Sequence, residues 1–396
     1  MANVTWWWRE NKMARKIQAL LSKTSVMPLI ASFKEEATLT RGQSVNRPTI
    51  SDVTVWDYTA LTDATKQDWT LTQELLTVDQ SKIIRQDYDP VEVKQIEYDI
   101  PNDLVKRIAY RLRDQMDRKF LTEVANANLS LDAWNFWGTS WAPVDLSSIA
   151  AERVFADAYA TLAWNAVESD KPWYAVVDPF TASSISQRAI SQWFNLWDRT
   201  FANGYTWNFL DFKVFVSNNL PATVDFTIAT AIPAATDTTT INGVVFTWQT
   251  TIWVVPWAVL AETSVTQSAA NLVVAINAWA WAATKYVEVS AANRKKLTNS
   301  DVVATSAAWV VTITSAWRMT LSKSFATPAQ WVFWDQTVKA MCGQMWAIDA
   351  VVQMKPNIQI NKQPWNLWST ILGHTLYGVK SFTEGRDRNL RLDIKA

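Results

Sequence analysis

The stretch Leu104–Asn126, "LVKRIAYRLRDQMDRKFLTEVAN", carries the strongest helix pattern in the chain. Apolar side chains recur at every fourth residue, which predicts one apolar face on a long α-helix. These side chains are Leu104, Ile108, Leu112, Met116, Phe120 and Val124. Pro101 and Asn102 supply a start signal, and charged residues fill the other side. The pattern therefore predicts a helix with one face on a core and one charged face.

The segments before this helix are predicted to need support from outside. Residues 10–23 have one apolar helical face, but a helix of that length is marginal alone in water. An extended, charged stretch is expected to follow it over residues 31–48. Residues 46–100 read as strand, with alternating runs at 49–59 and 69–80 that predict an extended hairpin. Because a lone hairpin is also marginal, we expect a body or a neighbouring subunit to cover these parts.

The segments after the helix predict a mixed domain with a second module inside it. Helices are expected at 147–167 and 180–192, and strands at 173–179 and 212–221. Residues 222–320 contain only ten charged residues and predict a small inserted α+β module. In it, Asn242-Gly243 between β-formers predicts a hairpin, followed by a helix at 264–277 and strands at 286–291 and 309–316. The end of the chain, from residue 373, reads as strand, charged turn and strand.

Tryptophan and glycine have unusual abundances. The chain has 25 Trp and 8 Gly in 396 residues, whereas glycine usually makes up about 7% of a protein. Trp257 and Trp365 follow prolines, and Trp279 and Trp281 follow the predicted helix 264–277. Glycine is the residue expected in such turns. We interpret most of these tryptophans as glycines, encoded by a stop codon that some genetic codes read as glycine and others as tryptophan. A truly Trp-rich carbohydrate-binding or cell-surface protein is the alternative, but the tryptophans form no periodic row.

Charge and composition exclude several functional classes. Lys plus Arg equals Asp plus Glu at 37 each, which argues against a dedicated nucleic-acid binder. A single cysteine excludes an internal disulfide framework, and a single histidine excludes a His-based metal site. The chain shows neither a run long enough to span a membrane nor a signal-peptide pattern. We expect a soluble protein, intracellular when made, without a cofactor or metal.

Residues that can carry chemistry are few. We expect His374 to be structural and Cys342 to be a buried, unreactive thiol. The acidic cluster Asp87, Asp89 and Glu92 lacks the ligand spacing of a calcium loop and is expected to be solvated. The basic run 293–296 also reads as a solvated loop, and the mixed run 384–391 reads equally as intersubunit ion pairs or as a charged turn. No phosphate-binding loop appears, even with glycine read for tryptophan. An enzyme with a hidden site is the second alternative, but the clustered His, Cys or carboxylates that it needs are lacking.

Three parts of the chain carry a family resemblance. The first runs from residues 41–59 through 71–96 to the helix 104–126, the second is the segment 203–221, and the third is the closing strand at 374–382. Their order resembles that of the major capsid protein of tailed bacteriophages, with the Hong Kong 97 fold. Gly42 and Val45 match the entry to its extended loop, and Tyr377 and Gly378 match the closing strand. Asp211 replaces the usual glycine before a Phe, and a tryptophan at 207 stands where the family favours glycine. The positions that we assign to assembly are Arg41, Gly42, Val45, Leu104, Ile108, Arg111, Leu112, Met116, Phe120, Tyr377 and Gly378.

The resemblance implies an α+β capsid fold divided into several parts. These are an N-terminal arm (1–45), an extended loop with peripheral strands (46–100), a spine helix (101–145), an axial domain (146–221), an insertion domain (222–320) and returning strands (321–396).

The same resemblance implies that many identical subunits self-assemble, as hexamers and pentamers, into an icosahedral head enclosing double-stranded DNA. The extended hairpin would lap over a neighbouring subunit, with a scaffolding protein and a portal as further partners. The resemblance implies no catalytic role, no cofactor, no sequence-specific DNA contact and no membrane. The protein would reside in the virion after assembly in the host bacterial cytoplasm.

Overall fold

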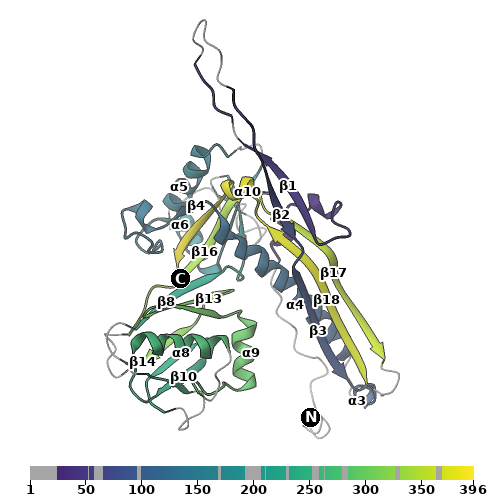
Figure 1. Ribbon diagram of the computed structural model, residues 1–396, viewed down its shortest axis with the longest axis vertical. Helices are drawn as coiled ribbons and strands as arrows, with labels where there is room; N and C mark the ends of the chain where they lie inside the picture. Colours follow the sequence, from purple (N-terminus) through teal and green to yellow (C-terminus); the bar gives the residue numbers. More distant parts are fainter. Residues whose placement is uncertain are drawn as a thin grey trace. The chain divides into compact units, whose positions relative to one another are not determined.

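The computed structural model describes most of the chain (Figure 1). The described residues are 25–51, 53–57, 66–95, 100–167, 171–191, 207–209, 211–228, 232–251, 258–262, 264–278, 284–325, 331–362 and 368–396. The predicted helix at 10–23 lies outside them. The chain divides into two compact units, one of Met1–Phe120 with Trp346–Glu384 and one of Leu121–Met345 with Gly385–Ala396. The domain boundaries expected from the sequence stay predictions.

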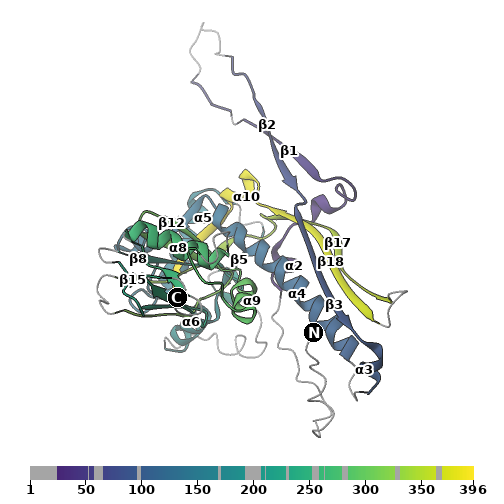
Figure 2. The same cartoon turned by 60° about the horizontal axis from the view of Figure 1, so that its bottom comes forward.

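The first unit is built on a three-stranded antiparallel sheet in the order β17-β18-β3. Its strands are β3 (Gln80–Tyr88), β17 (Asp349–Lys362) and β18 (Ser369–Lys380). The predicted long helix is confirmed as α4 (Ile100–Thr122), which runs along this sheet in both views (Figures 1 and 2). Ile108 and Leu112 of α4 pack against Ile371 of β18. The helix approaches closely because Gly373 has no side chain: a Cβ there would lie 2.3 Å from Cγ2 of Ile108.

The predicted hairpin is also confirmed. Strands β1 (Ser44–Ile50) and β2 (Leu71–Thr77) pair only with each other in the described structure, from Ser44 opposite Thr77 to Ile50 opposite Leu71. The first strand therefore begins and ends earlier than the pattern at 49–59 indicated. The short helix η1 (Lys34–Glu36) interrupts the stretch 31–48, which was expected to be extended. Another short helix, α2 (Met27–Ile30), lies directly before that stretch.

Residues 90–95 are a further correction, since they form α3 (Pro90–Gln95) inside the region that was read as strand. Asp89 accepts a hydrogen bond from the backbone N–H of Val91, and a proline occupies the first helical position, where its missing N–H costs nothing.

The second unit contains a large mixed sheet whose main path is β12-β13-β8-β16-β5-β7-β6. The strands on this path are β5 (Trp173–Val177), β6 (Trp207–Phe209), β7 (Phe212–Val216), β8 (Ala222–Ile228), β12 (Val303–Ala307), β13 (Val310–Ser315) and β16 (Thr337–Gln344). Strands β4 (Leu129–Leu131), β15 (Trp331–Phe333) and β19 (Asn389–Lys395) pair beside it. The predicted helices appear as α5 (Ala151–Trp164) and α6 (Pro179–Ser191), and they share one apolar core with β5, β7, β16 and β19. Short 3-10 helices η2 (Glu123–Asn126) and η3 (Ala133–Phe136) precede this domain.

A smaller sheet in the second unit has the order β11-β10-β9-β14. Its strands are β9 (Thr238–Ile241), β10 (Val244–Gln249), β11 (Ala258–Leu260) and β14 (Leu321–Ser324). The predicted helix α8 (Val265–Asn277) shares a core with this sheet and with β8 and β13. The Asn242-Gly243 turn is confirmed: both residues have positive φ, 50° and 72°, as a type I′ turn requires.

The strand expected at 286–291 is wrong. Tyr286 makes only an isolated bridge to Val259, and α9 (Ala291–Asn299) begins directly afterwards. Ser290 caps α9 by accepting the backbone N–H of Asn293. The basic run 293–296, which was read as a loop, therefore lies on this helix. The charged turn near the C-terminus similarly contains α10 (Thr383–Asp387).

The charged side of α4 also differs from expectation. Asp114 and Arg118 are each only 5% exposed and form an ion pair at 2.6 Å between Oδ2 and Nη2. Asp117 is 1% exposed. The C-terminal half of the helix is therefore covered on more than its apolar face, and Asp114, Asp117 and Arg118 are buried there with partners, as burial of charge requires.

Candidate assembly surfaces

The root of the β1–β2 hairpin is fixed to the first unit by polar contacts. Nη1 of Arg47 lies 2.9 Å from Oδ2 of Asp349, and its guanidinium lies 5.1 Å from the ring centre of Phe382. Nζ of Lys380 donates to the carbonyl of Leu75 at 2.8 Å. Burial raises the pKa of the Asp349 carboxyl above its usual value, although Ser32 and Arg47 oppose that shift. The root is therefore held in a defined direction.

The distal half of the hairpin, which runs from Ile50 and Leu71 outward, has a different surface. Ile50 is 65% exposed and Val55 is 93% exposed. Beyond the ladder, the backbone N–H of Thr54 donates to Oε1 of Gln67 at 2.9 Å, so the two arms stay together. Apolar side chains displayed this openly are uncommon on a monomer surface when they are contiguous, and they commonly mark a contact with another molecule.

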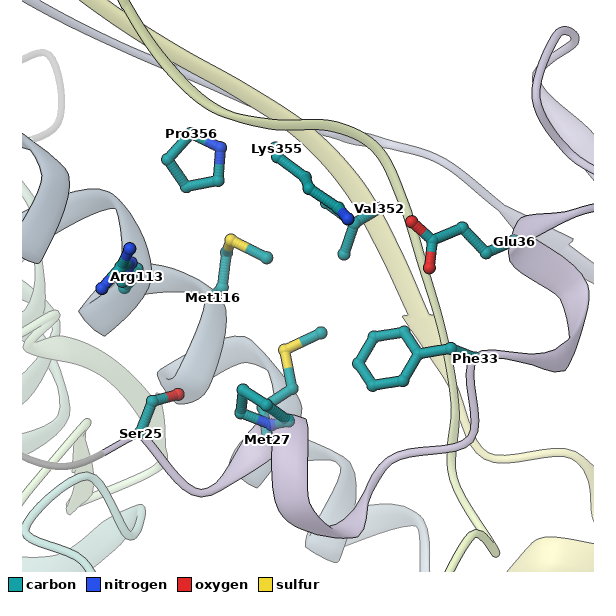
Figure 3. A pocket seen from close by; sticks show the side chains of 10 residues that line it. Ser25, Met27, Phe33, Glu36, Arg113, Met116, Val352, Lys355 and Pro356 are labelled. Atoms are coloured by element: carbon teal, nitrogen blue, oxygen red, sulfur yellow. The ribbon is translucent and has the colours of Figure 1, made fainter.

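A groove of about 540 Å³ lies elsewhere in the first unit, between α2, α4 and β17 (Figure 3). Figure 3 shows the thioethers of Met27 and Met116 directed into this space. Arg113 and Lys355 line it with two cationic groups, and Glu36 contributes one anionic group. The remaining lining is Ser25, Pro28, Phe33, Val352 and Pro356. The groove thus combines an apolar floor with a net positive lining.

One wall of this groove depends on Asp117 of α4. Its Oδ1 accepts from the backbone N–H groups of Val26 and Met27 at 2.7 and 2.9 Å, and from Oγ of Ser25 at 3.1 Å. These bonds satisfy donors at the start of α2 that have no partner inside the helix. The sequence offered no signal for this role, because an aspartate among arginines on a helix reads as a surface residue.

The assembly residues expected from the sequence fall into two groups in the structure. At the hairpin root, Gly42 has a φ of 106° and its carbonyl accepts from Nε2 of Gln353 at 2.6 Å. Val45 packs on the cluster that contains Leu76, and a Cβ on Gly378 would lie 2.4 Å from the Thr77 carbonyl oxygen.

Along α4, the helix expected to be the spine, Leu104, Ile108 and Leu112 contact the sheet, and Phe120 is fully buried. Tyr377 is buried, and its hydroxyl donates to the carbonyl of Gln115 at 3.3 Å. Met116 lines the groove, whereas Arg41 and Arg111 are exposed. The structure therefore places most of these residues in packing within the chain, and their part in assembly stays a prediction.

The other candidate residues have ordinary roles. Cys342 is fully buried, as expected, and burial raises the pKa of its thiol. His374 lies in β18 opposite Ile83. Asp87 accepts from Oγ1 of Thr370 at 2.7 Å, which with Arg85 lowers the pKa of its carboxyl.

Across the described ranges, no group of three or more His, Cys, Asp and Glu side chains is placed to hold a metal ion. Within the same part of the chain, no helix is long and apolar enough to cross a membrane.

Comparison with known proteins identifies the fold. No family model and no curated protein matches the sequence. Solved structures do match: a chain of Mycobacterium phage Che8 aligns with a TM-score of 0.56 and 12% identity, over 96% of this chain and 95% of that chain. The capsid structure of the cyanophage P-SCSP1u aligns with a TM-score of 0.54 and 9% identity, over 97% and 92%. A chain of Mycobacterium phage Ogopogo aligns with a TM-score of 0.51 and 9% identity, over 100% and 99%. The chain therefore has the fold of tailed-phage capsid proteins, the Hong Kong 97 fold that the sequence resemblance predicted.

Proposed function

We propose that this chain is the major capsid protein of a tailed bacteriophage and that its copies assemble into an icosahedral head around double-stranded DNA. The observation that carries the proposal is the extent of the structural match. The alignment with the cyanophage capsid covers 97% of this chain and 92% of that chain, so the match includes elements of both units and not a single motif. The alternative, a Trp-rich carbohydrate-binding or cell-surface protein, is not favoured by this fold.

The hairpin supports assembly through its exposed distal half. Apolar area removed from water stabilises a contact by about 25 cal/mol per Å², and Ile50, Val55 and Leu71 hold such area in the open. A strand pair with open edges also offers unpaired backbone groups to a neighbour. In the proposed shell, the distal hairpin of one copy lies against a second copy.

The groove between α2, α4 and β17 is the surface that we assign to this contact. Residues 51–70 contain four aspartates and one lysine, which complements the net positive lining of the groove. Residues 1–24, which precede the groove residue Ser25, contain five basic residues and one glutamate. Charge therefore favours the hairpin of another copy over the chain's own N-terminal segment as the occupant.

Single cysteines test this contact without interference, because the natural Cys342 is buried. We expect a mixture of Asp68→Cys and Lys355→Cys subunits to form disulfide-linked dimers containing one of each in assembled particles. Lys296→Cys on α9 replaces Lys355→Cys in the control mixture and should not link. If the particles assemble normally but give no more of the mixed dimer than the control, the hairpin does not lie in this groove. That outcome would leave the proposed capsid function untouched.

The wider proposal includes a scaffolding protein and a portal as partners, assembly in the bacterial cytoplasm and residence in the virion. Zero formal charge suits a shell that encloses DNA without binding it strongly. The test is protein identification and electron microscopy of DNA-filled phage particles from the source culture. We expect this chain to be the most abundant protein and to account for the repeating shell density. A shell built from a different chain would contradict the function.

A further inference from the structure

Three tryptophans in the described part of the chain adopt a backbone conformation that suits glycine. Trp137, Trp141 and Trp346 have φ values of 68°, 67° and 67°. In this left-handed region the Cβ of an L-residue crowds the following carbonyl oxygen, and for a bulky residue the conformation is a genuine outlier. Glycine adopts it without that penalty and is the usual residue there.

The backbones of these residues make defined contacts. Trp137 ends η3, and its N–H donates to the carbonyl of Trp134 at 3.2 Å. The N–H of Trp141 donates to the carboxylate of Asp132, and that of Trp346 donates to the carbonyl of Ile30 at 2.9 Å. The three positions are therefore turns in which the backbone N–H is held by a hydrogen bond, to a backbone carbonyl at 137 and 346 and to a side-chain carboxylate at 141.

Their side chains, in contrast, have little to pack against. Trp137 is 92% exposed, Trp141 is 85% exposed and Trp346 is 50% exposed. Tryptophan is highly buried on average, since its ring offers a large apolar area. Other tryptophans are also exposed, namely Trp56, Trp69, Trp134, Trp164, Trp309, Trp334 and Trp368.

Two tryptophans behave in the opposite way. Trp173 is 4% exposed, and its ring centre lies 5.6 Å from that of Phe212. Trp248 is fully buried, and its Nε1 donates to Oγ1 of Thr239 at 3.0 Å. Replacing either ring with a hydrogen atom would leave a large void in a core. Trp334 is exposed but its Nε1 donates to a threonine hydroxyl at 2.7 Å, so it is assigned to neither group.

We propose that the protein in its native source carries glycine at positions 137, 141 and 346 and true tryptophan at positions 173 and 248. The two groups then come from two codons: a reassigned stop codon that the native host reads as glycine, and the ordinary tryptophan codon. The structure thereby assigns individual tryptophan positions to glycine or to tryptophan. The composition of 8 Gly and 25 Trp alone cannot make that assignment. This inference does not depend on the capsid function.

Peptide-mass mapping of protein from the native source tests the assignment directly. We expect peptides spanning 137, 141 and 346 to be lighter by one Trp-to-Gly difference per site, and peptides spanning 173 and 248 to match tryptophan. The gene sequence should show one codon at the first three positions and another at the last two. Tryptophan in the native peptides at the first three positions, or glycine at either of the last two, would overturn the proposal.

Recombinant variants give an independent measurement. We expect Trp137→Gly and Trp346→Gly to raise the thermal unfolding midpoint of the recombinant chain, because each relieves a left-handed conformation and loses little packing. Trp173→Gly is the matched control and should lower that midpoint. A fall at all three positions would contradict the assignment, and the peptide masses decide it even if a variant fails to fold.

Discussion

Replacement of Asp117 by alanine should release the start of α2 from α4. The change leaves the backbone N–H groups of Val26 and Met27 without the carboxylate at 2.7 and 2.9 Å. A buried donor that loses its partner costs about 1–3 kcal/mol. With two such donors, and with Ser25 half-buried and able to turn to water, we expect a local loss of about 3 kcal/mol.

The measurement is amide hydrogen exchange of the unassembled subunit, read at residues 26 and 27. A loss of about 3 kcal/mol corresponds to roughly a hundredfold faster exchange, since every 1.4 kcal/mol is tenfold. Asp117→Asn should lose less, because its amide oxygen still accepts a hydrogen bond. Asp103→Ala is the control: its i,i+4 pair with Arg107 at 3.3 Å is partly exposed, and such pairs contribute about 0.3–0.5 kcal/mol. Equal exchange in Asp117→Ala and Asp103→Ala would refute the role assigned to Asp117.

Three further predictions concern packing and titration. Gly373→Ala should destabilise the first unit by about 1–3 kcal/mol in urea unfolding, the usual range for overpacking, because the added Cβ would meet Cγ2 of Ile108. Adding Ile108→Leu, which lacks that methyl group, should recover part of the lost stability. If no stability is recovered, this clash is not the cause. Because burial raises the pKa of Asp349, the folded chain binds that proton more tightly than the unfolded chain does. The resulting stabilisation is complete below about pH 3.8 and is lost as pH rises through the raised pKa. Asp349→Asn should flatten this part of the curve of unfolding free energy against pH, and an unchanged slope would contradict the shift. Cys342 should resist thiol reagents until the chain is unfolded, and rapid labelling of the native subunit would show that the buried site opens.

Local patterns predicted the parts of the fold in which local and tertiary preferences agree. The four-residue repeat from Leu104 gave the spine helix because its apolar face does pack on a sheet. The Asn242-Gly243 pair gave its turn because both residues tolerate positive φ. The β1–β2 hairpin was predictable from two alternating, strand-forming runs with a loop between them, although its first strand was placed several residues too late.

Tertiary context decided the elements that were missed. Residues 286–291 have strand-forming side chains, but Tyr286 makes only one bridge before Ser290 caps a helix. The buried state of Asp114 and Asp117 was not predictable, since it depends on segments distant in sequence. Helix α3 was recoverable in principle, because Asp89 followed by a proline is an N-terminal helix signal.

The anchored root and open distal half of the hairpin have a mechanical consequence. Arg47 and Lys380 fix the inner pairs of the β1–β2 ladder to the rest of the first unit. The outer pairs, near Ile50 and Leu71, are held by the pairing between β1 and β2. A two-stranded ribbon of this kind twists and bends at low cost, because no core has to repack when its outer pairs change direction. One sequence can therefore occupy several slightly different surroundings with the same folded body, which is the tolerance that the proposed closed shell of chemically identical but not symmetry-equivalent subunits would demand.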